Sequence, residues 1–368
     1  MISAQSVQVD FTVAICTYNG EDRLPQLLDC LRSQSISSKE AQGASPEASQ
    51  GPTSDLTWEV LVVDNNSTDR TQQIVQDYQT RWPAACLLRY CFEAQQGLAF
   101  ARRCAVEAAR GQFIGFLDDD NLPDSEWVAT AYRFGQAHPQ AGAYGSRIHG
   151  EFEASPPANF RRIAALLALT ERGSEAHRYE PGRKVLPPGA GLVVRKQAWI
   201  ETVPSSSVLL GRIGNSMIAG EDLEALLHIQ QAGWEVWYNP EMRICHRIPY
   251  WRLEKDYLIR LGRGIGLSRY QTRMLSVKPW QRPLACLAYA INDLRKIAIH
   301  LIKYRTATYS DPVAACEMEL FVSSLISPCY MWQRQLIQWF NQRTKEQTRG
   351  TPSCRCPEQE QVNGEEQN

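Results

Sequence analysis

The sequence predicts an α/β fold in which a mostly parallel sheet is flanked by helices, with a helical extension after it. Short apolar runs that suit strands buried on both faces recur in the first part of the chain. The runs at residues 11–16 and 59–63 are each followed by apolar residues at helical spacing. Strands that alternate with helices in this way favour a parallel sheet.

The first unit comprises a strand over residues 11–16, with the sequence FTVAIC, and a helix. The helix is predicted by leucines at the spacing i, i+3, i+4 and i+7, namely Leu24, Leu27, Leu28 and Leu31. This spacing places all of them on one face of a helix.

The second unit comprises a strand over residues 59–63, a polar turn over residues 64–69 and a helix through Tyr78. The small polar side chains of the turn suit the start of that helix. A third helix is expected over residues 98–109. After it, a strand over residues 113–117 ends at three consecutive aspartates.

The composition argues against several classes of protein. The 368 residues carry a formal net charge of -1, which gives no overall reason to bind nucleic acid. The 11 cysteines are odd in number and scattered, which indicates reduced thiols and a cytoplasmic location. Charged residues interrupt each long apolar stretch before the ~18 residues that a membrane span needs.

Three segments differ from these units. Residues 35–55 and 344–368 are polar and poor in large apolar side chains, so a flexible insertion and a disordered tail are expected. Residues 284–302 carry apolar side chains at helical spacing, with basic residues beside them. Packing of this helix on the α/β domain is the favoured expectation. The alternative is peripheral contact with a membrane, at the inner face of the plasma membrane.

Polar residues cluster after three of the predicted strands. Open α/β sheets bind ligands at the carboxyl ends of their strands, so these clusters are candidate site residues. The first cluster is Thr17, Tyr18 and Asn19, the second begins at Asp64, and the third is residues 118–121.

The third cluster has the chemistry of a metal site. Asp118 and Asp120 are two positions apart, so in an extended segment they project to the same side. Like charges that close need a cation, and Mg²⁺ or Mn²⁺ bound through carboxylate oxygens meets that need. The alternative is a solvated acidic turn that caps a helix beginning near Asp124.

Glu221 and Asp222 open another predicted helix. Acidic residues in a first helical turn are favoured by the helix dipole whatever the function. A carboxylate at a helix start can also serve as a general base, if it lies within reach of an acceptor hydroxyl. The residues alone leave both explanations open.

Two weaker signals follow. Gly189 and Gly191 lie in a turn that can let backbone approach a ligand closely. His246 comes after a predicted strand over residues 234–238, and a lone histidine is more often a packed or surface residue than a ligand.

Six stretches, taken together and in order, resemble glycosyltransferase family 2, an inverting family with the Rossmann-like GT-A fold that uses nucleotide-diphosphate sugars. They are VAICTYNG at 13–20, VLVVDNNSTD at 60–69, QGLAFARR at 96–103, GQFIGFLDDDN at 111–121, PGAGLVVRK at 188–196 and AGEDLEALLHIQQAGW at 219–234. A narrower likeness, in residues 260–269, is to cyanobacterial glycosyltransferases of hormogonium polysaccharide biosynthesis.

The resemblance implies a role for each candidate residue. The nucleotide-sugar would lie against Thr17, Tyr18, Asn19, Asp64, Arg102, Asp118, Asp119, Gly189 and Gly191. The D-x-D motif of the family maps onto Asp118 and Asp120, so the metal ligands would be Asp120, Asp118 and His246. Asp222 would be the general base, with Glu221 beside it as a second catalytic carboxylate.

The implied reaction moves a sugar from a UDP- or GDP-linked donor to a glycan or lipid-linked acceptor, in exopolysaccharide or cell-surface glycan synthesis. It would use Mg²⁺ or Mn²⁺, and a single displacement would invert the sugar. The glycosyltransferase domain would span residues 8–250, and the helical extension residues 251–343. Two alternatives stay open, a nucleotidyltransferase and a non-catalytic scaffold that binds nucleotide-sugars.

Overall fold

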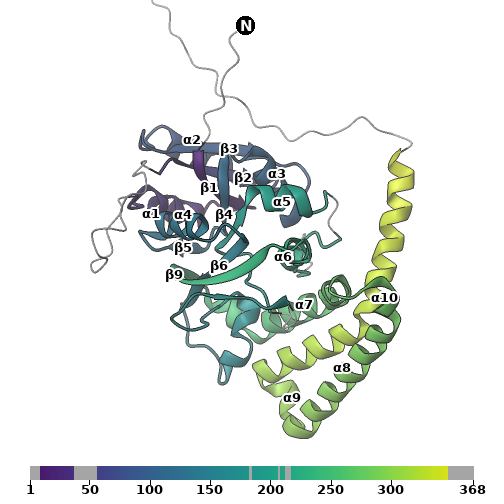
Figure 1. Ribbon diagram of the computed structural model, residues 1–368. Coiled ribbons are helices and arrows are strands. Elements are labelled where there is room, and N and C mark those ends of the chain that lie inside the picture. The colour runs from purple at the N-terminus through teal and green to yellow at the C-terminus, as the bar shows by residue number, and fades with distance from the viewer. Residues whose placement is uncertain (1–8, 37–55, 182–184, 206–207, 212–216, 347–368) are drawn as a thin grey trace, which may run out of the picture.

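The computed structural model describes residues 9–36, 56–181, 185–205, 208–211 and 217–346. They form an α/β domain with a group of long helices beside it (Figure 1). The insertion predicted over residues 35–55 and the tail predicted over residues 344–368 fall almost wholly outside the described residues.

Within the described residues the strands form one nine-stranded sheet in the order β3-β2-β1-β4-β8-β6-β9-β5, with β7 paired to β9. Their bounds are β1 Val9–Thr17, β2 Trp58–Asp64, β3 Leu87–Phe92, β4 Gly111–Leu117, β5 Asn121–Pro123, β6 Ala141–Phe152, β7 His177–Arg178, β8 Leu192–Arg195 and β9 Glu235–Ile248. The expected parallel pairing holds for β3, β2, β1 and β4. Strand β8 is antiparallel to both neighbours, whereas the long pairing of β6 with β9 is parallel, so the sheet is mixed with parallel ladders predominating.

Strand β8 is antiparallel to β4 and β6 because the chain enters it at the edge of the sheet where β4 ends. The N–H of Gly191 donates to the carbonyl of Phe116 at 2.9 Å, beside the carboxyl end of β4. The chain therefore starts β8 at the edge where β1, β2 and β4 end. This entry brings the glycine turn before β8 to the same edge as the three aspartates.

Helices cover both faces of the sheet (Figure 1). Their bounds are α1 Leu24–Arg32, α2 Thr71–Gln79, α3 Leu98–Ala108, α4 Trp127–Ala137, α5 Lys196–Thr202 and α6 Glu221–Gln231. Alternate residues of β1 enter two cores: Phe11 and Ile15 pack with the leucines of α1, whereas Ala14 packs with Ala101 of α3. The prediction of a first strand buried on both faces is confirmed.

Strand β9 is much longer than the strand predicted over residues 234–238, and it contains His246. Its pairing with β6 breaks between Ser146 and Arg147, whose partners are Asn239 and Arg243. Pro240 falls in this irregularity, where a residue without a backbone N–H is tolerated. A proline normally signals the end of a strand, which explains why the second half of β9 was not predicted.

The remaining helices form the expected extension. They are α7 Lys255–Leu275, α8 Arg282–Tyr304, α9 Ala307–Ser310 and α10 Pro312–Glu346. Helices α7 and α10 approach closely because Gly262 and Gly266 leave room: a Cβ on either would come 2.7 Å or 2.8 Å from a backbone oxygen of α10. Among the described helices, none combines the length and the apolar character that crossing a bilayer requires.

Candidate active site

The middle aspartate of the three, Asp119, joins the turn after β4 to the turn after β1. Its Oδ2 accepts a hydrogen bond from Thr17 Oγ1 at 2.7 Å. The guanidinium of Arg23 donates to both carboxylate oxygens, at 2.7 Å and 3.0 Å. Asp119 therefore holds these two turns together, and its carboxylate is largely used by the protein.

Asp120 lies against two cationic or ionisable partners. Arg252 Nη1 donates to Asp120 Oδ2 at 2.7 Å, and His246 Nε2 lies 3.5 Å from the same oxygen. Burial opposes ionisation of this carboxyl group. The neighbouring His246 and Arg252 outweigh that effect and hold the pKa of Asp120 well below its usual range. Asp120 is therefore an ionised, nearly buried carboxylate.

The pKa of Asp118 is shifted in the opposite direction from that of Asp120. Burial, followed by the charge of Asp120, raises the pKa of the Asp118 carboxyl above its ordinary value, and the nearby Arg102 opposes this. The alternative of a solvated capping turn is not supported, because the side chains of Asp119 and Asp120 are only 12% and 11% exposed and α4 has no side-chain cap. This turn gathers three partly buried carboxyl groups.

The start of α6 meets the aspartate turn through Arg102. Arg102 Nη1 lies 3.4 Å from Glu221 Oε1, and the two side chains are 4% and 7% exposed. Burial disfavours the charged guanidinium, but Glu221, Asp222 and Asp118 together raise the pKa of Arg102 above its ordinary value. One buried arginine thus interacts with acidic groups from both ends of the site.

Gly189 completes this part of the site. Its N–H donates to Asp222 Oδ2 at 2.6 Å. A Cβ at this position would overlap the guanidinium of Arg102, so no larger residue fits without moving that side chain. Gly191 differs: its backbone has a φ of +64°, a conformation that favours glycine, and it packs on Ile244 and Ser146.

The turns after β1 and β2 are tied to each other. The N–H of Asn19 donates to Ser67 Oγ at 2.9 Å, and the N–H of Thr68 donates to Asn19 Oδ1 at 2.9 Å. Tyr18, which directly precedes Asn19, is 46% exposed. Its ring is therefore available to a ligand at this edge of the sheet.

Asp64 is buried and already bonded. Its Oδ1 accepts from the Ser67 N–H and its Oδ2 from the Tyr90 hydroxyl, both at 2.8 Å. Any contact between Asp64 and a nucleotide base has to use the remaining lone pairs of these oxygens.

A divalent cation can be tested against these residues. In the part of the chain that the structure describes, no three His, Cys, Asp or Glu side chains form a ready metal cluster. Two partly buried carboxyl groups, Asp118 and Asp120, with the imidazole of His246 beside them, are suitable donors for Mg²⁺ or Mn²⁺. Nδ1 of His246 is buried and has no hydrogen-bond partner. The residues fit such a cation if Arg252 gives up its contact with Asp120.

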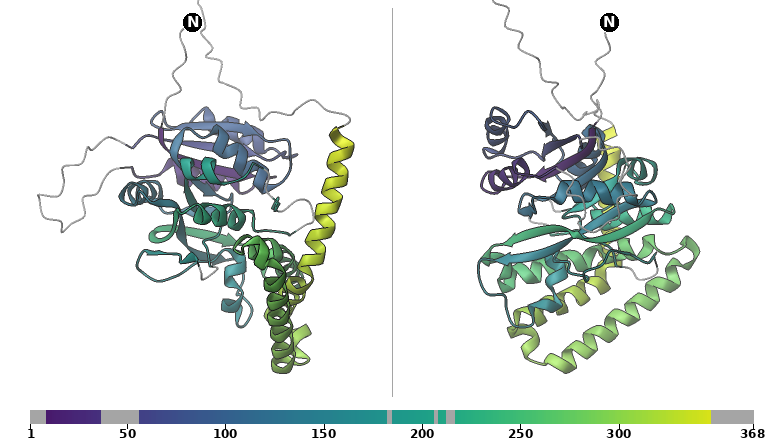
Figure 2. Two further views of the ribbon diagram at one scale, coloured as in Figure 1. Left: turned by 45° about the vertical axis from the view of Figure 1, so that its right-hand side comes forward. Right: turned by 60° about the vertical axis from the view of Figure 1, so that its left-hand side comes forward.

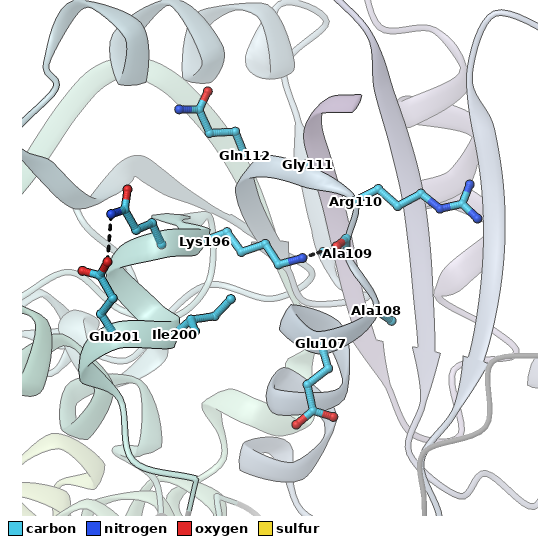
Figure 3. A pocket seen from close by; sticks show the side chains of 10 residues that line it. Glu107, Ala108, Ala109, Arg110, Gly111, Gln112, Lys196, Ile200 and Glu201 are labelled. Atoms are coloured by element: carbon cyan, nitrogen blue, oxygen red, sulfur yellow. Dashed lines mark hydrogen bonds between the residues drawn. The ribbon is translucent and has the colours of Figure 1, made fainter. Parts of the chain in front are cut away.

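A cavity of about 740 Å³ lies elsewhere (Figure 3). It is lined by residues at the start of β4, including Arg110 and Gly111, and by Lys196, which donates to the carbonyl of Ala109 at 2.6 Å. Since Asp118 follows the other end of β4, this cavity is at the opposite edge of the sheet. It is not part of the candidate site.

Comparison with known proteins gives the family. A family model described as glycosyl transferase family 2 matches residues 12–195, half of the 368 residues. The chain belongs to glycosyl transferase family 2. The matched part contains the three aspartates and the glycine turn, and it ends before Glu221, Asp222 and His246.

Two curated relatives are similar to this family 2 chain. Glucosyl-dolichyl phosphate glucuronosyltransferase of Haloferax volcanii is 24% identical over 204 residues, which are 54% of this chain and 62% of the relative. Succinoglycan biosynthesis protein ExoM of Rhizobium meliloti is 21% identical over 250 residues, 67% of this chain and 70% of the relative. The chain thus spans less than two thirds of the length of the first of these relatives.

Mannosyltransferase PcManGT from Pyrobaculum calidifontis, solved in complex with GDP-Man and Mn²⁺, has the same fold. It superposes with a TM-score of 0.51 at 18% identity, over 88% of this chain and 88% of the other. At that identity the likeness shows the fold alone. The expected GT-A fold and membership of family 2 are both confirmed.

The structure brings most of the predicted site residues together, but two arginines were missed. Asp118, Arg102, Glu221, Asp222 and Gly189 form one connected cluster. Arg23 and Arg252, which bind Asp119 and Asp120, were not singled out from the sequence. No local pattern distinguishes them from the other arginines of the chain, and their position depends on the turn after β1 and on the 3₁₀ helix η4 (Tyr250–Leu253).

Proposed function

We propose that this protein is an inverting glycosyltransferase. It moves a sugar from a UDP- or GDP-linked donor to a hydroxyl of a glycan or lipid-linked acceptor, in exopolysaccharide or cell-surface glycan synthesis. The observation that carries this proposal is the buried Arg102, around which acidic groups from the end of β4 and the start of α6 converge. Family 2 membership and relatives named for glycan or lipid-linked sugar transfer support it.

Asp222 is the general base in this proposal. Glu221 is 8% exposed and is already bonded to Arg102 and to the N–H of Gly220, so its role is to position Arg102. Asp222 is more exposed, and the Gly189 N–H orients its carboxylate. That carboxylate takes the proton of the acceptor hydroxyl while the hydroxyl oxygen attacks the anomeric carbon. A single displacement of this kind inverts the sugar.

The leaving diphosphate lies beside the aspartate turn. Asp118 and Asp120, with His246, would hold Mg²⁺ or Mn²⁺, which when bound neutralises charge on the leaving group. Arg23 and Arg252 add fixed positive charge next to the same turn. Their guanidinium groups are suited to phosphate oxygens.

The nucleoside part of the donor lies against the tied turns after β1 and β2. Tyr18 offers an exposed aromatic ring, and Thr17 and Asn19 are held in place by Asp119 and Ser67. Asp64 supports this wall from inside the sheet, because its Oδ1 accepts from the N–H of Ser67. Asp119 acts here through Thr17 and Arg23 rather than by direct contact with the donor.

A nucleotide-sugar panel tests the proposal. Purified protein is incubated with UDP- and GDP-linked sugars, with Mn²⁺ or Mg²⁺ or with a chelator, and release of nucleoside diphosphate is measured. We expect slow, metal-dependent release from one donor, because water replaces the missing acceptor. Release of nucleoside diphosphate should be lost in Asp120→Asn and Asp222→Asn. It should be retained in Asp77→Asn, which is at an exposed position of α2.

The alternatives give different results in the same panel. A scaffold binds a nucleotide-sugar without turnover, even after lipid-linked and polysaccharide acceptors are added. A nucleotidyltransferase releases no nucleoside diphosphate from the panel, and it releases pyrophosphate when a nucleoside triphosphate and a sugar phosphate are supplied instead. Either result would overturn the proposed glycosyl transfer.

A further inference from the structure

Helix α8 packs on the protein through the side that carries Asp293 and His300, and it presents most of its large apolar side chains outward. Asp293 and His300 are 1% and 5% exposed, on the side that faces α7 and α10. The large apolar residues on the other side are 53% to 75% exposed, namely Leu284, Leu287, Ile291, Leu294 and Ile302. Figure 2 shows α8 along the outer edge of the molecule, away from the sheet. We call this side the outer face of α8.

Specific bonds fix this orientation. Arg273 of α7 donates to both carboxylate oxygens of Asp293, at 2.6 Å and 2.9 Å, and the hydroxyl of Ser324 in α10 donates to it at 2.7 Å. His300 Nε2 lies 2.9 Å from the carbonyl oxygen of Ala314. If the helix were rotated to bury its other side, these contacts would break, and Asp293 and His300 would lose their present partners.

The exposed charged side chains of α8 all carry positive charge. Asp293 is the one acidic residue of α8, and it is buried and paired. Exposed basic residues lie on α8 or directly after it, namely Arg282, Arg295, Lys303 and Arg305. Trp280, just before the helix, is 75% exposed. An exposed apolar strip of this extent is unusual in a monomeric protein and marks an interaction surface.

We propose that the outer face of α8 lies on a membrane surface that carries anionic lipids. The leucine and isoleucine side chains enter the boundary between headgroups and acyl chains, and the arginine and lysine side chains bind anionic headgroups. The charges favour lipid over a second copy of this chain, since two such helices would bring basic side chains together. The favoured sequence-based expectation, that the apolar stripe packs on the protein, is wrong: the opposite side of the helix does so. This inference goes beyond the proposed sugar transfer, because the chemistry of that transfer does not involve α8.

Vesicle flotation of the full-length protein tests this surface. One set of vesicles is phosphatidylcholine alone, and the other contains about one third phosphatidylglycerol. We expect the protein to float at least about tenfold more with the anionic vesicles. A double change of Leu287→Gln and Ile291→Gln, and separately Arg295→Glu with Lys303→Glu, should each remove that binding.

The matched control is Ile200→Gln, since Ile200 of α5 is 63% exposed but lies outside the outer face. It should float like the unchanged protein. Thermal unfolding and sedimentation of every variant are measured in parallel, and because the changed side chains are exposed their unfolding temperatures should match. The assay measures no sugar turnover, so its result is independent of the proposed function.

Three outcomes would overturn the proposal. The first is failure of the unchanged protein to float with either kind of vesicle. The second is flotation that persists in the Leu287 and Ile291 double variant. The third is a stable oligomer that this double variant converts to monomer without any vesicle binding, which would assign the outer face to a second copy.

Discussion

Arg252 and Asp120 form an ion pair, with Arg252 Nη1 2.7 Å from Asp120 Oδ2. The same nitrogen lies 3.2 Å from His246 Nε2. The guanidinium therefore places positive charge next to two proposed metal ligands, where a divalent cation would also place it. A cation that binds Asp120 has to compete with Arg252.

Removing Arg252 should tighten metal binding. In Arg252→Gln the competing charge is gone, so we expect the dissociation constant for Mn²⁺ to fall by about threefold to tenfold. Electron paramagnetic resonance of free Mn²⁺, without nucleotide, measures this directly. The control is Arg247→Gln, an exposed arginine nearby that should leave the constant unchanged. Weaker Mn²⁺ binding in Arg252→Gln would show that Arg252 assists the cation instead of competing with it.

Asp119 and Asp120 should respond differently to the same change. Asp119 is bonded to Thr17 and Arg23, so Asp119→Asn should cost about 1–2 kcal/mol of unfolding free energy and leave Mn²⁺ affinity within about threefold. Asp120→Asn should weaken Mn²⁺ binding at least about tenfold. Urea unfolding and Mn²⁺ titration of both variants give the comparison. Equal loss of Mn²⁺ affinity in the two would contradict the assigned roles.

A methyl group at Gly189 should disturb the site more than the fold. In Gly189→Ala the added Cβ overlaps the guanidinium of Arg102, which Glu221 holds. We expect kcat/KM to fall about 100-fold, with a stability loss of about 1–3 kcal/mol. Gly173→Ala is the control, because it strains a backbone φ of +101° but meets nothing within 4 Å. Similar catalytic losses in both variants would rule out a specific role for Gly189.

The Asp293 pair should make the helical extension sensitive to pH. Burial acts to raise the pKa of the Asp293 carboxyl group. The hydrogen bonds from Arg273 and Ser324 outweigh burial and hold that pKa below its ordinary value of 3.8. A lowered pKa contributes stability above pH 3.8 that is lost as pH falls through the folded-state value. Asp293→Asn should therefore cost about 2–4 kcal/mol near pH 7. The difference from the unchanged protein should narrow as the pH falls below 3.8, towards the lower folded-state pKa.

Urea unfolding at several pH values measures this dependence. The control is Asp29→Asn, which removes an ion pair with Arg32 that is exposed on α1. It should change stability by less than about 1 kcal/mol at every pH. A cost for Asp293→Asn that stays constant with pH would show that the charge of Asp293 has no part in its effect.

The local pattern of apolar residues was sufficient to predict the strands that are buried on both faces and the helices packed on them. The run from Phe11 and the leucines of α1 have the apolar periodicity of their elements, and tertiary contacts reinforce it. Strand β6, Ala141–Phe152, was missed because it mixes small, charged and glycine residues. Its pairing with β8 and β9 defines it, and such pairing depends on residues distant in the sequence.

The sequence was sufficient to predict the site residues that lie at the ends of strands. Polar residues after β1, β2 and β4 meet because parallel strands end at one edge. Arg252 was not predictable, because a turn after a long strand with a bulge carries it to Asp120. The direction of the outer face of α8 also depends on distant partners, Arg273 and Ser324, which decide which side of an amphipathic helix is buried.

The configuration of the released sugar is the most direct test of the proposed displacement at Asp222. With the active donor from the panel and water as acceptor, proton NMR at early times distinguishes the anomer of the free sugar before it equilibrates. The account predicts the anomer opposite to that of the donor, and loss of this product in Asp222→Asn. Release of the sugar with the configuration of the donor would contradict a single displacement, and with it the role proposed for Asp222.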